Sequence, residues 1–396
     1  MITVVLGKVH GTPSRRAATS IIVGMGILMV GYGLLGSLLS IRAKAEGFST
    51  DSMGVINSMT YIGFLIATPV AVRMLGRFTR TSCFAMFAST MASACVMYGV
   101  LVNKPSWMLL RLIGGGSLGG VYVVVESWLN DLASNKTRGR LIAIYVAVIS
   151  GGIAVGQVLL NVANTNTVVP FLIAGAATAA ASLALIRIPA SRSLASNDGH
   201  ISLKSVVQLV PSGAIAMVLV GMTQSAIIVM ASVWATNVGL TSSQIAKVMI
   251  AIMMGTVLLQ VPAGVVADKV PRRLLFVVLA LGSAATCLAL VSLQPGSAPS
   301  LVAFGLLGGM STPLYGLANV YTNDWLPADK VVAAGSALVR LYAIGAMTGP
   351  LISSTSMSQF GSTGYFWALL TLNCLIGAFM IVRIIVAPDS PVALAK

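Results

Sequence analysis

The sequence predicts an all-α membrane protein whose twelve transmembrane helices form two similar six-helix bundles. Three observations support this prediction. The composition suits lipid, the apolar stretches are long enough to cross a bilayer, and the second half of the chain repeats the first.

The composition indicates that lipid surrounds most of the chain. Of the 396 residues, 57% are hydrophobic and only 8% are charged, with a mean hydropathy of +0.95. A soluble protein carries roughly 25% charged residues. The net charge of +15 does not indicate nucleic-acid binding, because the 24 Lys and Arg residues form short clusters between apolar runs and no continuous basic stripe.

Twelve mostly apolar stretches reach the roughly 20 residues that a membrane-spanning helix requires. Their approximate bounds are 18–41, 52–72, 81–102, 106–130, 138–160, 168–187, 211–236, 244–267, 273–293, 299–323, 331–353 and 364–386.

The distribution of Lys and Arg predicts the orientation. With a cytoplasmic N-terminus, 18 of the 24 residues fall on the cytoplasmic side and 3 on the other side. Arg111, Lys247 and Arg340 lie within predicted helices, and Lys247 is close enough to a helix end to extend to the surface. The positive-inside rule therefore predicts that both termini are cytoplasmic.

An internal repeat divides the chain into halves. Gly47 and Gly63 match Gly239 and Gly255 at an offset of 192, and the offset is then 193 without a gap. At that offset Gly115, Gly116, Tyr122, Asn130, Asp131, Gly152 and Gly156 match Gly308, Gly309, Tyr315, Asn323, Asp324, Gly345 and Gly349. Such a parallel repeat predicts bundles at 1–187 and 210–396, joined by a polar, turn-rich linker at 188–209.

The loop after the eighth predicted helix carries Gly264, Asp268, Lys269, Arg272 and Arg273, and it resembles the loop signature of the major facilitator superfamily. An acid at a helix end can pair with a nearby arginine or with the start of a neighbouring helix, and so form a cytoplasmic gate. The alternative is a basic cytoplasmic loop with an incidental acid. In the first half Arg73 occupies the Asp position, while Arg77 is retained. Arg77 is a further gate candidate, together with Arg138 and Arg140 of the loop after the fourth predicted helix.

The fourth predicted helix holds the most informative charges. Arg111 and Glu126 lie within about 60° of one helix face, together with Tyr122. Ionisable residues inside a span usually face a cavity or a partner, so all three are candidates for the substrate or proton site. Alternatively, Arg111 binds carbonyl groups, and Glu126 anchors Arg138 or Arg140 of the next loop.

The second half offers further site candidates. Tyr315 and Asn319 lie one turn apart, and Asn319 is the repeat mate of Glu126. Arg340 is deep in the eleventh helix and is expected to face protein or water. Gln224 of the seventh predicted helix is another candidate for lining the substrate cavity. In the first half, Tyr32 of the first predicted helix is a candidate for the same role.

Glycines near the middle of the eleventh predicted helix suggest a hinge. Gly345, Gly349 and Pro350 can permit local bending, and Gly152 and Gly156 are the repeat mates of the glycines. Gln157 takes the place of the proline that antiporters of the superfamily carry in the fifth helix, so the motif does not establish export by antiport.

Short motifs in both halves resemble the YcaD-like subfamily of major facilitators. They are Val123-Val124-Val125-Glu126-Ser127, Arg138-Gly139-Arg140, Pro313-Leu314-Tyr315, and Gly345 with Gly349-Pro350. The resemblance implies an inner-membrane transporter in which helices 1, 4, 7 and 10 line a cavity, and two halves that rock around it.

The leading hypothesis is secondary active transport of a small organic solute, coupled to protons through Glu126. The alternatives are an uncoupled facilitator or exchanger with a structural Glu126, and a non-transporting receptor or scaffold. We expect a monomer with no enzymatic activity, metal or cofactor. The only histidines are His10 and His200, and a phosphate-binding loop of the Gly-x-x-x-x-Gly-Lys type is absent from the sequence.

Overall fold

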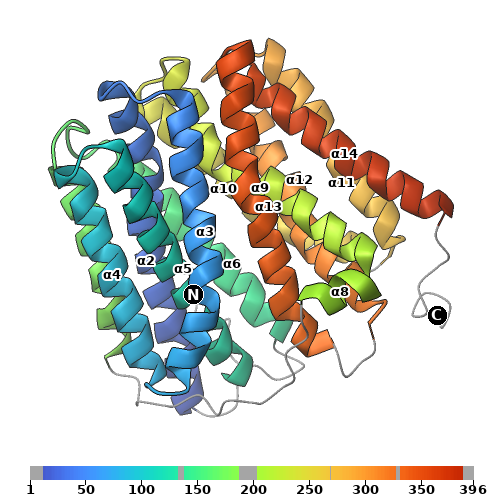
Figure 1. Ribbon diagram of the computed structural model, residues 1–396, viewed down its shortest axis with the longest axis horizontal. Coiled ribbons are helices and arrows are strands. Elements are labelled where there is room, and N and C mark those ends of the chain that lie inside the picture. Colours follow the sequence, from blue (N-terminus) through green and yellow to red (C-terminus); the bar gives the residue numbers. More distant parts are fainter. Residues whose placement is uncertain (1–11, 133–137, 187–202, 268, 327–330, 387–396) are drawn as a thin grey trace. The chain divides into compact units, whose positions relative to one another are not determined.

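The structure is a computed structural model that describes residues 12–132, 138–186, 203–267, 269–326 and 331–386. Within these ranges every regular element is a helix (Figure 1). Backbone contacts divide the chain into two units, Met1–Phe48 with Met59–Ala195, and Ser49–Ser58 with Ser196–Lys396. The all-helical fold expected from the composition is confirmed.

The described residues of the first unit form seven helical segments. These are α2 (Thr12–Ala45), α3 (Thr50–Leu75, from Met59 onward), α4 (Arg80–Val100), α5 (Lys104–Leu132), α6 (Arg138–Leu159), α7 (Val169–Ala180) and the 3₁₀ helix η1 (Ala181–Leu185). Helix α2 packs against α6 and α7, and α4 packs against α5 and α7. Apolar side chains of α2, α4, α5 and α6 fill the core between them.

Two helices of this unit differ from their predictions by more than about three residues at an end or in helix type. Helix α2 continues to Ala45, so Arg42 lies in its last turn, where it pairs with Glu46 at 2.7 Å and donates to the Asn166 carbonyl oxygen. The predicted sixth helix at 168–187 is α at Val169–Ala180 and 3₁₀ from Ala181. The hydropathy of the sequence predicts neither the extra turn of α2 nor the 3₁₀ segment, because it depends on the length of an apolar stretch. It does not depend on the contacts at a helix end or on the type of helix.

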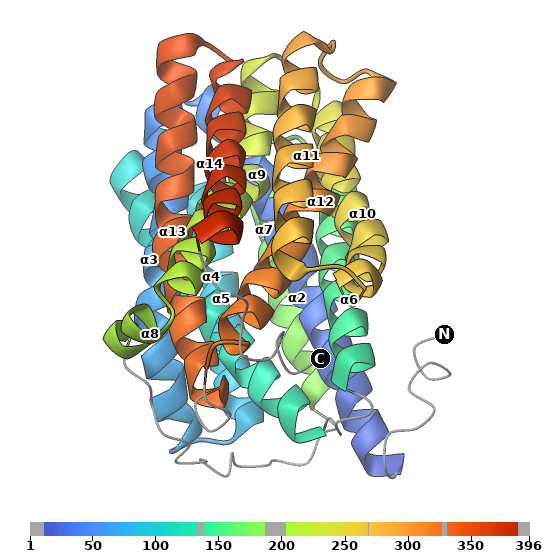
Figure 2. The same cartoon turned by 90° about the vertical axis from the view of Figure 1, so that its right-hand side faces the viewer.

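The second unit repeats the pattern of the first. It contains α8 (Leu203–Leu209), α9 (Pro211–Asn237), α10 (Ser242–Ala267), α11 (Arg272–Ser292), α12 (Ala298–Asn323), α13 (Val331–Phe360) and α14 (Gly364–Val386). Helix α9 packs on α13, α10 on α12, and α11 on both α12 and α14; Figure 2 shows α11, α13 and α14 running lengthwise. Helix α8 lies within the stretch predicted as a linker, and its Val206 is buried in the core of this unit.

Glycines hold the paired helices close together. A Cβ on Gly115 of α5 would overlap the Thr60 carbonyl oxygen of α3, and a Cβ on Gly308 of α12 would overlap the Ile252 carbonyl oxygen of α10. The contacted residues are themselves offset by 192. In four further pairs of matched glycines, the carbonyl groups that the two glycines contact are also matched in the repeat. These pairs are Gly63 with Gly255, Gly116 with Gly309, Gly152 with Gly345, and Gly156 with Gly349. Equivalent contacts in both units give the sequence repeat a three-dimensional basis.

The turns after α2 and α9 also match. Gly47 and Gly239 both adopt a positive φ, +71° and +81°, at the point where the chain reverses into the next helix. Glycine occupies this left-handed conformation at little cost, whereas other L-residues are strained there. The first matched pair of the repeat is therefore explained by turn geometry.

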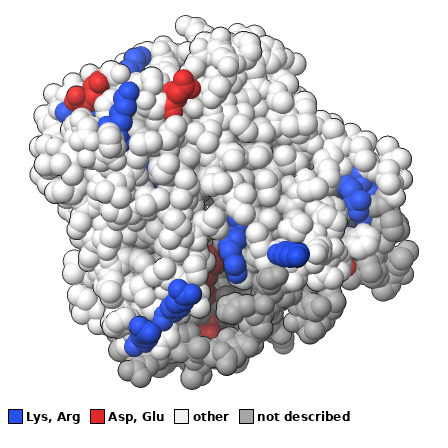
Figure 3. Space-filling model, in the orientation of Figure 1, with Lys and Arg blue, Asp and Glu red and all other residues white. Residues whose placement is uncertain are grey.

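The surface of the described helices suits a lipid environment. Ten of these helices are long and apolar enough to cross a membrane, and the two shorter apolar stretches, Ile144–Leu159 and Val169–Leu185, occupy the places of the predicted fifth and sixth spans. Large apolar side chains are widely exposed, for example Val302 and Phe360 at 64% and 65%. Figure 3 shows one face on which charged side chains are few and scattered. Water would penalise such a surface, and lipid would not.

Replacing Gly308 by Ala tests the glycine contacts. The added methyl group has to displace the backbone of α10, so we expect a loss of about 1–3 kcal/mol of stability, seen as a lower melting temperature in detergent. Gly316 of the same helix faces open space, and Gly316→Ala is the matched control, which should be neutral or slightly stabilising. Equal melting temperatures for the two variants would contradict the packing role.

Candidate functional site

The two charged site candidates of helix α5, Arg111 and Glu126, lie in two separate places along the helix. Arg111 and Glu126 share a face, but 15 residues of α-helix correspond to about 22 Å along the axis. A small solute cannot contact both at once. The structure therefore divides the candidates of the first unit into a group around Arg111 and a group around Glu126.

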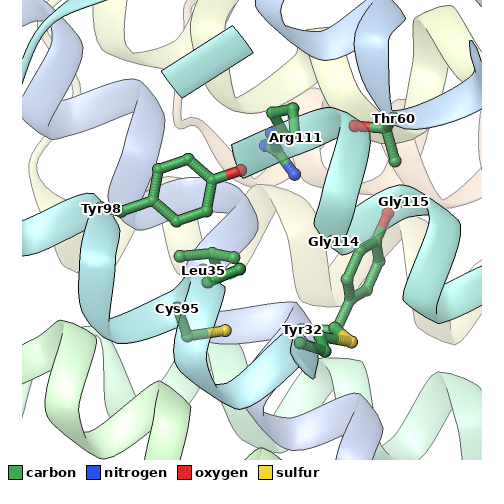
Figure 4. A pocket seen from close by; sticks show the side chains of 10 residues that line it. Tyr32, Leu35, Thr60, Cys95, Tyr98, Arg111, Gly114 and Gly115 are labelled. Atoms are coloured by element: carbon green, nitrogen blue, oxygen red, sulfur yellow. The ribbon is translucent and has the colours of Figure 1, made fainter. Parts of the chain in front are cut away.

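The Arg111 group forms a small pocket within the first unit. Arg111 is only 5% exposed, and the pocket is lined by residues of α2, α3, α4 and α5: Tyr32, Leu35, Thr60, Met91, Ala94, Cys95, Tyr98, Arg111, Gly114 and Gly115. Figure 4 shows the hydroxyl groups of Tyr98 and Thr60 pointing toward the Arg111 side chain from two sides. Tyr32 and Arg111 are both site candidates in the sequence, and the structure brings them together. Thr60 and Tyr98 were not predicted, because they belong to no motif.

The Glu126 group combines a carboxylate with aromatic rings. The Glu126 side chain is exposed, three residues before the end of the apolar span at Leu129. One turn earlier, Tyr122 lies 6.1 Å from the Phe64 ring and 6.5 Å from the Tyr145 ring, with the tyrosine pair in T-shaped geometry. The Tyr145 hydroxyl is buried and has no hydrogen-bond partner among the described residues. It also lies within electrostatic range of Glu126.

The second unit contains a related tyrosine pair. Tyr315 of α12 and Tyr342 of α13 are T-shaped at 5.2 Å. The Tyr342 hydroxyl donates to Gln224 of α9 at 3.2 Å, and the Gln224 amide donates to the carbonyl oxygens of Ser311 and Thr312 at 2.8 and 3.2 Å. Gln224 therefore links α9, α12 and α13 with both of its polar atoms engaged.

The other polar candidates of this unit bond within their own helices. Asn319 donates to the Tyr315 carbonyl oxygen at 3.1 Å, and Arg340 donates to the Ser336 carbonyl oxygen at 3.3 Å. Both side chains are half-buried. Their roles in a substrate site remain predictions.

Two ion pairs connect helices at the ends predicted to be cytoplasmic. Arg80 at the start of α4 pairs with Asp131 at the end of α5, and Arg272 at the start of α11 pairs with Asp324 at the end of α12. The partners follow the repeat, with offsets of 192 and 193. In the sequence, Asp131 and Asp324 are recognisable as repeat mates, but neither ion pair was predicted. The available signal was that the two arginines are also repeat mates, at an offset of 192.

The remaining gate candidates lie apart from these pairs or outside the described residues. Arg273 donates to the Arg383 carbonyl oxygen at 3.2 Å and lies over the Tyr321 and Trp325 rings. Arg77, Gly264 and Lys269 are exposed. Asp268, and the side chains of Arg138 and Arg140, fall outside the described part of the chain, so the gate remains a prediction.

The predicted hinge glycines lie at close helix contacts. Gly152 and Gly156 of α6 approach the α2 backbone, and Gly345 and Gly349 of α13 approach the α9 backbone. Helix α13 remains helical through Pro350. In α6 the corresponding Gln157 donates to the Gly33 carbonyl oxygen at 2.6 Å and accepts from the Ser37 hydroxyl at 2.7 Å. These residues join helices in the present state, and a hinge role stays a prediction.

Ligands for a metal do not gather in the described ranges. Within them, no group of three or more His, Cys, Asp or Glu side chains is close enough to hold an ion. Cys83, Cys95 and Cys287 are buried free thiols, and Cys374 is an exposed one. His10 and His200 lie outside the described residues.

Comparisons with known proteins place this geometry in a family of transporters. The family model of the Major Facilitator Superfamily matches residues 21–210 and 213–395. The uncharacterized MFS-type transporter YcaD of Escherichia coli (strain SMS-3-5 / SECEC) is 25% identical over 367 residues, which cover 90% of this chain and 93% of that protein. YcaD of Shigella flexneri matches with the same values.

Solved transporter structures share the fold. A mutant of the nucleoside transporter NupG superimposes with a TM-score of 0.79 at 11% identity, covering 92% of this chain and 99% of that chain. A D-xylose-proton symporter superimposes with a TM-score of 0.68 at 18% identity, covering 92% and 96%. At these identities the likeness concerns the fold alone.

Replacing Asp131 by Asn tests the repeated ion pairs. The Arg80 side chain is 5% exposed and would lose its carboxylate partner, but Asp131 is 58% exposed, so we expect a moderate loss of about 1–3 kcal/mol. Thermal unfolding in detergent measures it. Asp51→Asn, at an exposed acid in the first turn of α3, is the control and should change stability by less than about 0.5 kcal/mol. Equal melting temperatures for Asp131→Asn and Asp51→Asn would show that the ion pair does not contribute to stability.

Proposed function

Because the chain belongs to the Major Facilitator Superfamily, and is thus a multi-pass membrane transport protein with a small-molecule substrate, we propose that it is a secondary active transporter coupled to protons through Glu126. In this proposal a small organic solute crosses the bacterial inner membrane by alternating access, with both termini in the cytoplasm. The observation that carries it is the exposed Glu126 carboxylate inside an apolar span.

An acid in this position has a chemical use that an apolar residue lacks. A carboxylate inside a span is costly, and it persists where it pairs with, or exchanges, a charge. Binding of a proton removes that charge. Transport steps that move the site out of contact with water are then favoured when Glu126 is protonated, and solute exchange at an open site is favoured when it is ionised. This alternation couples solute movement to the proton gradient.

The surroundings of Glu126 supply groups that could hold a solute beside it. Tyr122 and Tyr145 present aromatic surface, and the Tyr145 hydroxyl can donate or accept a hydrogen bond. A carboxylate flanked by aromatic rings favours solutes with a cationic or hydrogen-bond-donating group next to an apolar body. The sugar and nucleoside named for the solved neighbours belong to those proteins.

Glu126→Gln tests proton coupling. A thermal-shift screen on purified protein first supplies a ligand, because a bound solute stabilises the fold. In proteoliposomes with a pH gradient, we expect the unaltered protein to accumulate that solute and Glu126→Gln to equilibrate it without accumulation. Glu46→Gln is the control, since Glu46 pairs with Arg42 near the end of α2. Accumulation by Glu126→Gln with normal pH dependence would leave Glu126 a structural residue. Binding without flux in every protein would indicate a receptor.

Tyr145→Phe tests whether this hydroxyl serves the solute or the fold. Removing a buried hydroxyl without a partner should leave the melting temperature unchanged or slightly raised, while weakening the ligand-induced shift. Tyr342→Phe is the matched control, because its hydroxyl donates to Gln224, and it should cost about 1 kcal/mol of stability. A destabilised Tyr145→Phe protein with an unchanged ligand response would assign Tyr145 to packing.

A further inference from the structure

We propose that the second unit binds the phosphate group of an anionic phospholipid where the start of α11 meets the ends of α12 and α14, with Arg383 as the principal ligand. We call Arg273, Trp325 and Arg383 the headgroup site. It goes beyond the proposed function, because it uses neither Glu126 nor the aromatic residues around that acid.

Arg273 holds the headgroup site together. From the first turn of α11, its guanidinium donates to the Arg383 carbonyl oxygen of α14 at 3.2 Å. The same guanidinium lies 5.8 Å from the centre of the Trp325 ring, which follows the end of α12. Helix α11 packs on both α12 and α14 (Figure 2). The three residues therefore gather at one end of the unit, the end predicted to be cytoplasmic.

Arg383 and Trp325 carry N–H groups that lack acceptors. The Arg383 Nε and the Trp325 Nε1 are both buried and have no hydrogen-bond partner among the described residues. Arginine and tryptophan side chains donate hydrogen bonds and accept none, so a ligand here has to supply acceptor oxygens. Phosphate does so, and its geometry matches a guanidinium group. Arg383 is half-buried and lies in the last turn of α14, from which a long side chain reaches the boundary between lipid and water.

The surface next to Arg383 favours a lipid over a free phosphate ion. Val382 and Ile385 of α14 and Leu274 and Val278 of α11 are all exposed apolar side chains. In a bilayer such side chains face acyl chains, and tryptophan is enriched at the level of the headgroups. A phospholipid can therefore place its phosphate at the guanidinium and its acyl chains along these two helices.

The charges favour an anionic headgroup over a zwitterionic one. Arg272, next to the site, is paired with Asp324. Among the described residues, the three ion pairs all involve arginines other than Arg383. A zwitterionic headgroup would bring its own cation close to Arg383, whereas the headgroup of phosphatidylglycerol carries the phosphate charge alone.

The repeat provides an internal comparison. Both units have the helix-end ion pair, so this contact belongs to the shared scaffold. The repeat mates of Arg273 and Trp325, at offsets of 192 and 193, are Thr81 and Leu132. The first unit thus closes the same helix ends without a second arginine or a tryptophan. Packing alone does not require these residues in the second unit, which is consistent with a ligand there.

A lipid titration of the purified full-length protein tests the site. Delipidated protein in detergent is melted with increasing dioleoylphosphatidylglycerol, dioleoylphosphatidylcholine or glycerol 3-phosphate. We expect a saturable rise of the melting temperature with phosphatidylglycerol and little or none with the other two, because a ligand stabilises the fold that binds it. An equal response to both lipids, or no response to either, would overturn the proposal. A response to glycerol 3-phosphate as strong as that to phosphatidylglycerol would indicate a small-anion site and refute the lipid.

Three variants locate the effect. Arg383→Gln should weaken the apparent affinity for phosphatidylglycerol about tenfold, as expected for one lost hydrogen bond to a charged group. Arg383→Lys keeps the charge and should retain more affinity than Arg383→Gln. Arg73→Gln is the matched control, because Arg73 is an exposed arginine in the last turn of α3, and it should bind as the unaltered protein does. Equal affinities of Arg383→Gln and Arg73→Gln would place the lipid elsewhere and refute the site.

Discussion

The close approach of helix backbones at glycine is the interaction on which the rest of this structure depends. Lipid removes most of the hydrophobic drive for helix association, so helices in a bilayer need extensive van der Waals contact, and small residues permit it. In the first unit Gly115 seats α5 on α3, and Gly156 seats α6 on α2. Because the glycine face of α5 is fixed in this way, the directions of Arg111 and Glu126 along the same helix are fixed with it.

The two units share their backbone contacts and differ in their polar side chains. Both have the glycine contacts, the left-handed turn glycine and the helix-end ion pair. The differences fall at polar positions: Glu126 opposite Asn319 in the repeat, and Gln157 opposite Pro350. In a duplicated fold, a packing contact between two helices is retained because a change on one helix requires a change on the other. Polar positions that face a transport pathway are less constrained and can diverge toward a specific function. The asymmetry of the polar residues is thus where the specific function is to be sought.

Polar residues in this chain either join neighbouring helices or leave a buried polar group free for another role, and only their contacts distinguish the two cases. Gln224 is a site candidate in the sequence and Gln157 stands in place of a proline, but each satisfies carbonyl and hydroxyl groups of neighbouring helices. Thr60 and Tyr145 carry no motif, yet their buried hydroxyls are without partners among the described residues. Residue type and position in a helix do not distinguish these cases, because a hydrogen bond between helices depends on which faces meet.

The sequence by itself determined the helical class, the number of spans, the repeat and the membership of a transporter family. These follow from apolar length, from composition and from matched residues, all of which are local or additive along the chain. Only the tertiary structure decided the partner of Arg80 and the four-helix pocket that includes Thr60 and Tyr98. Each of these depends on contacts between segments far apart in sequence, and no periodicity within one segment encodes them.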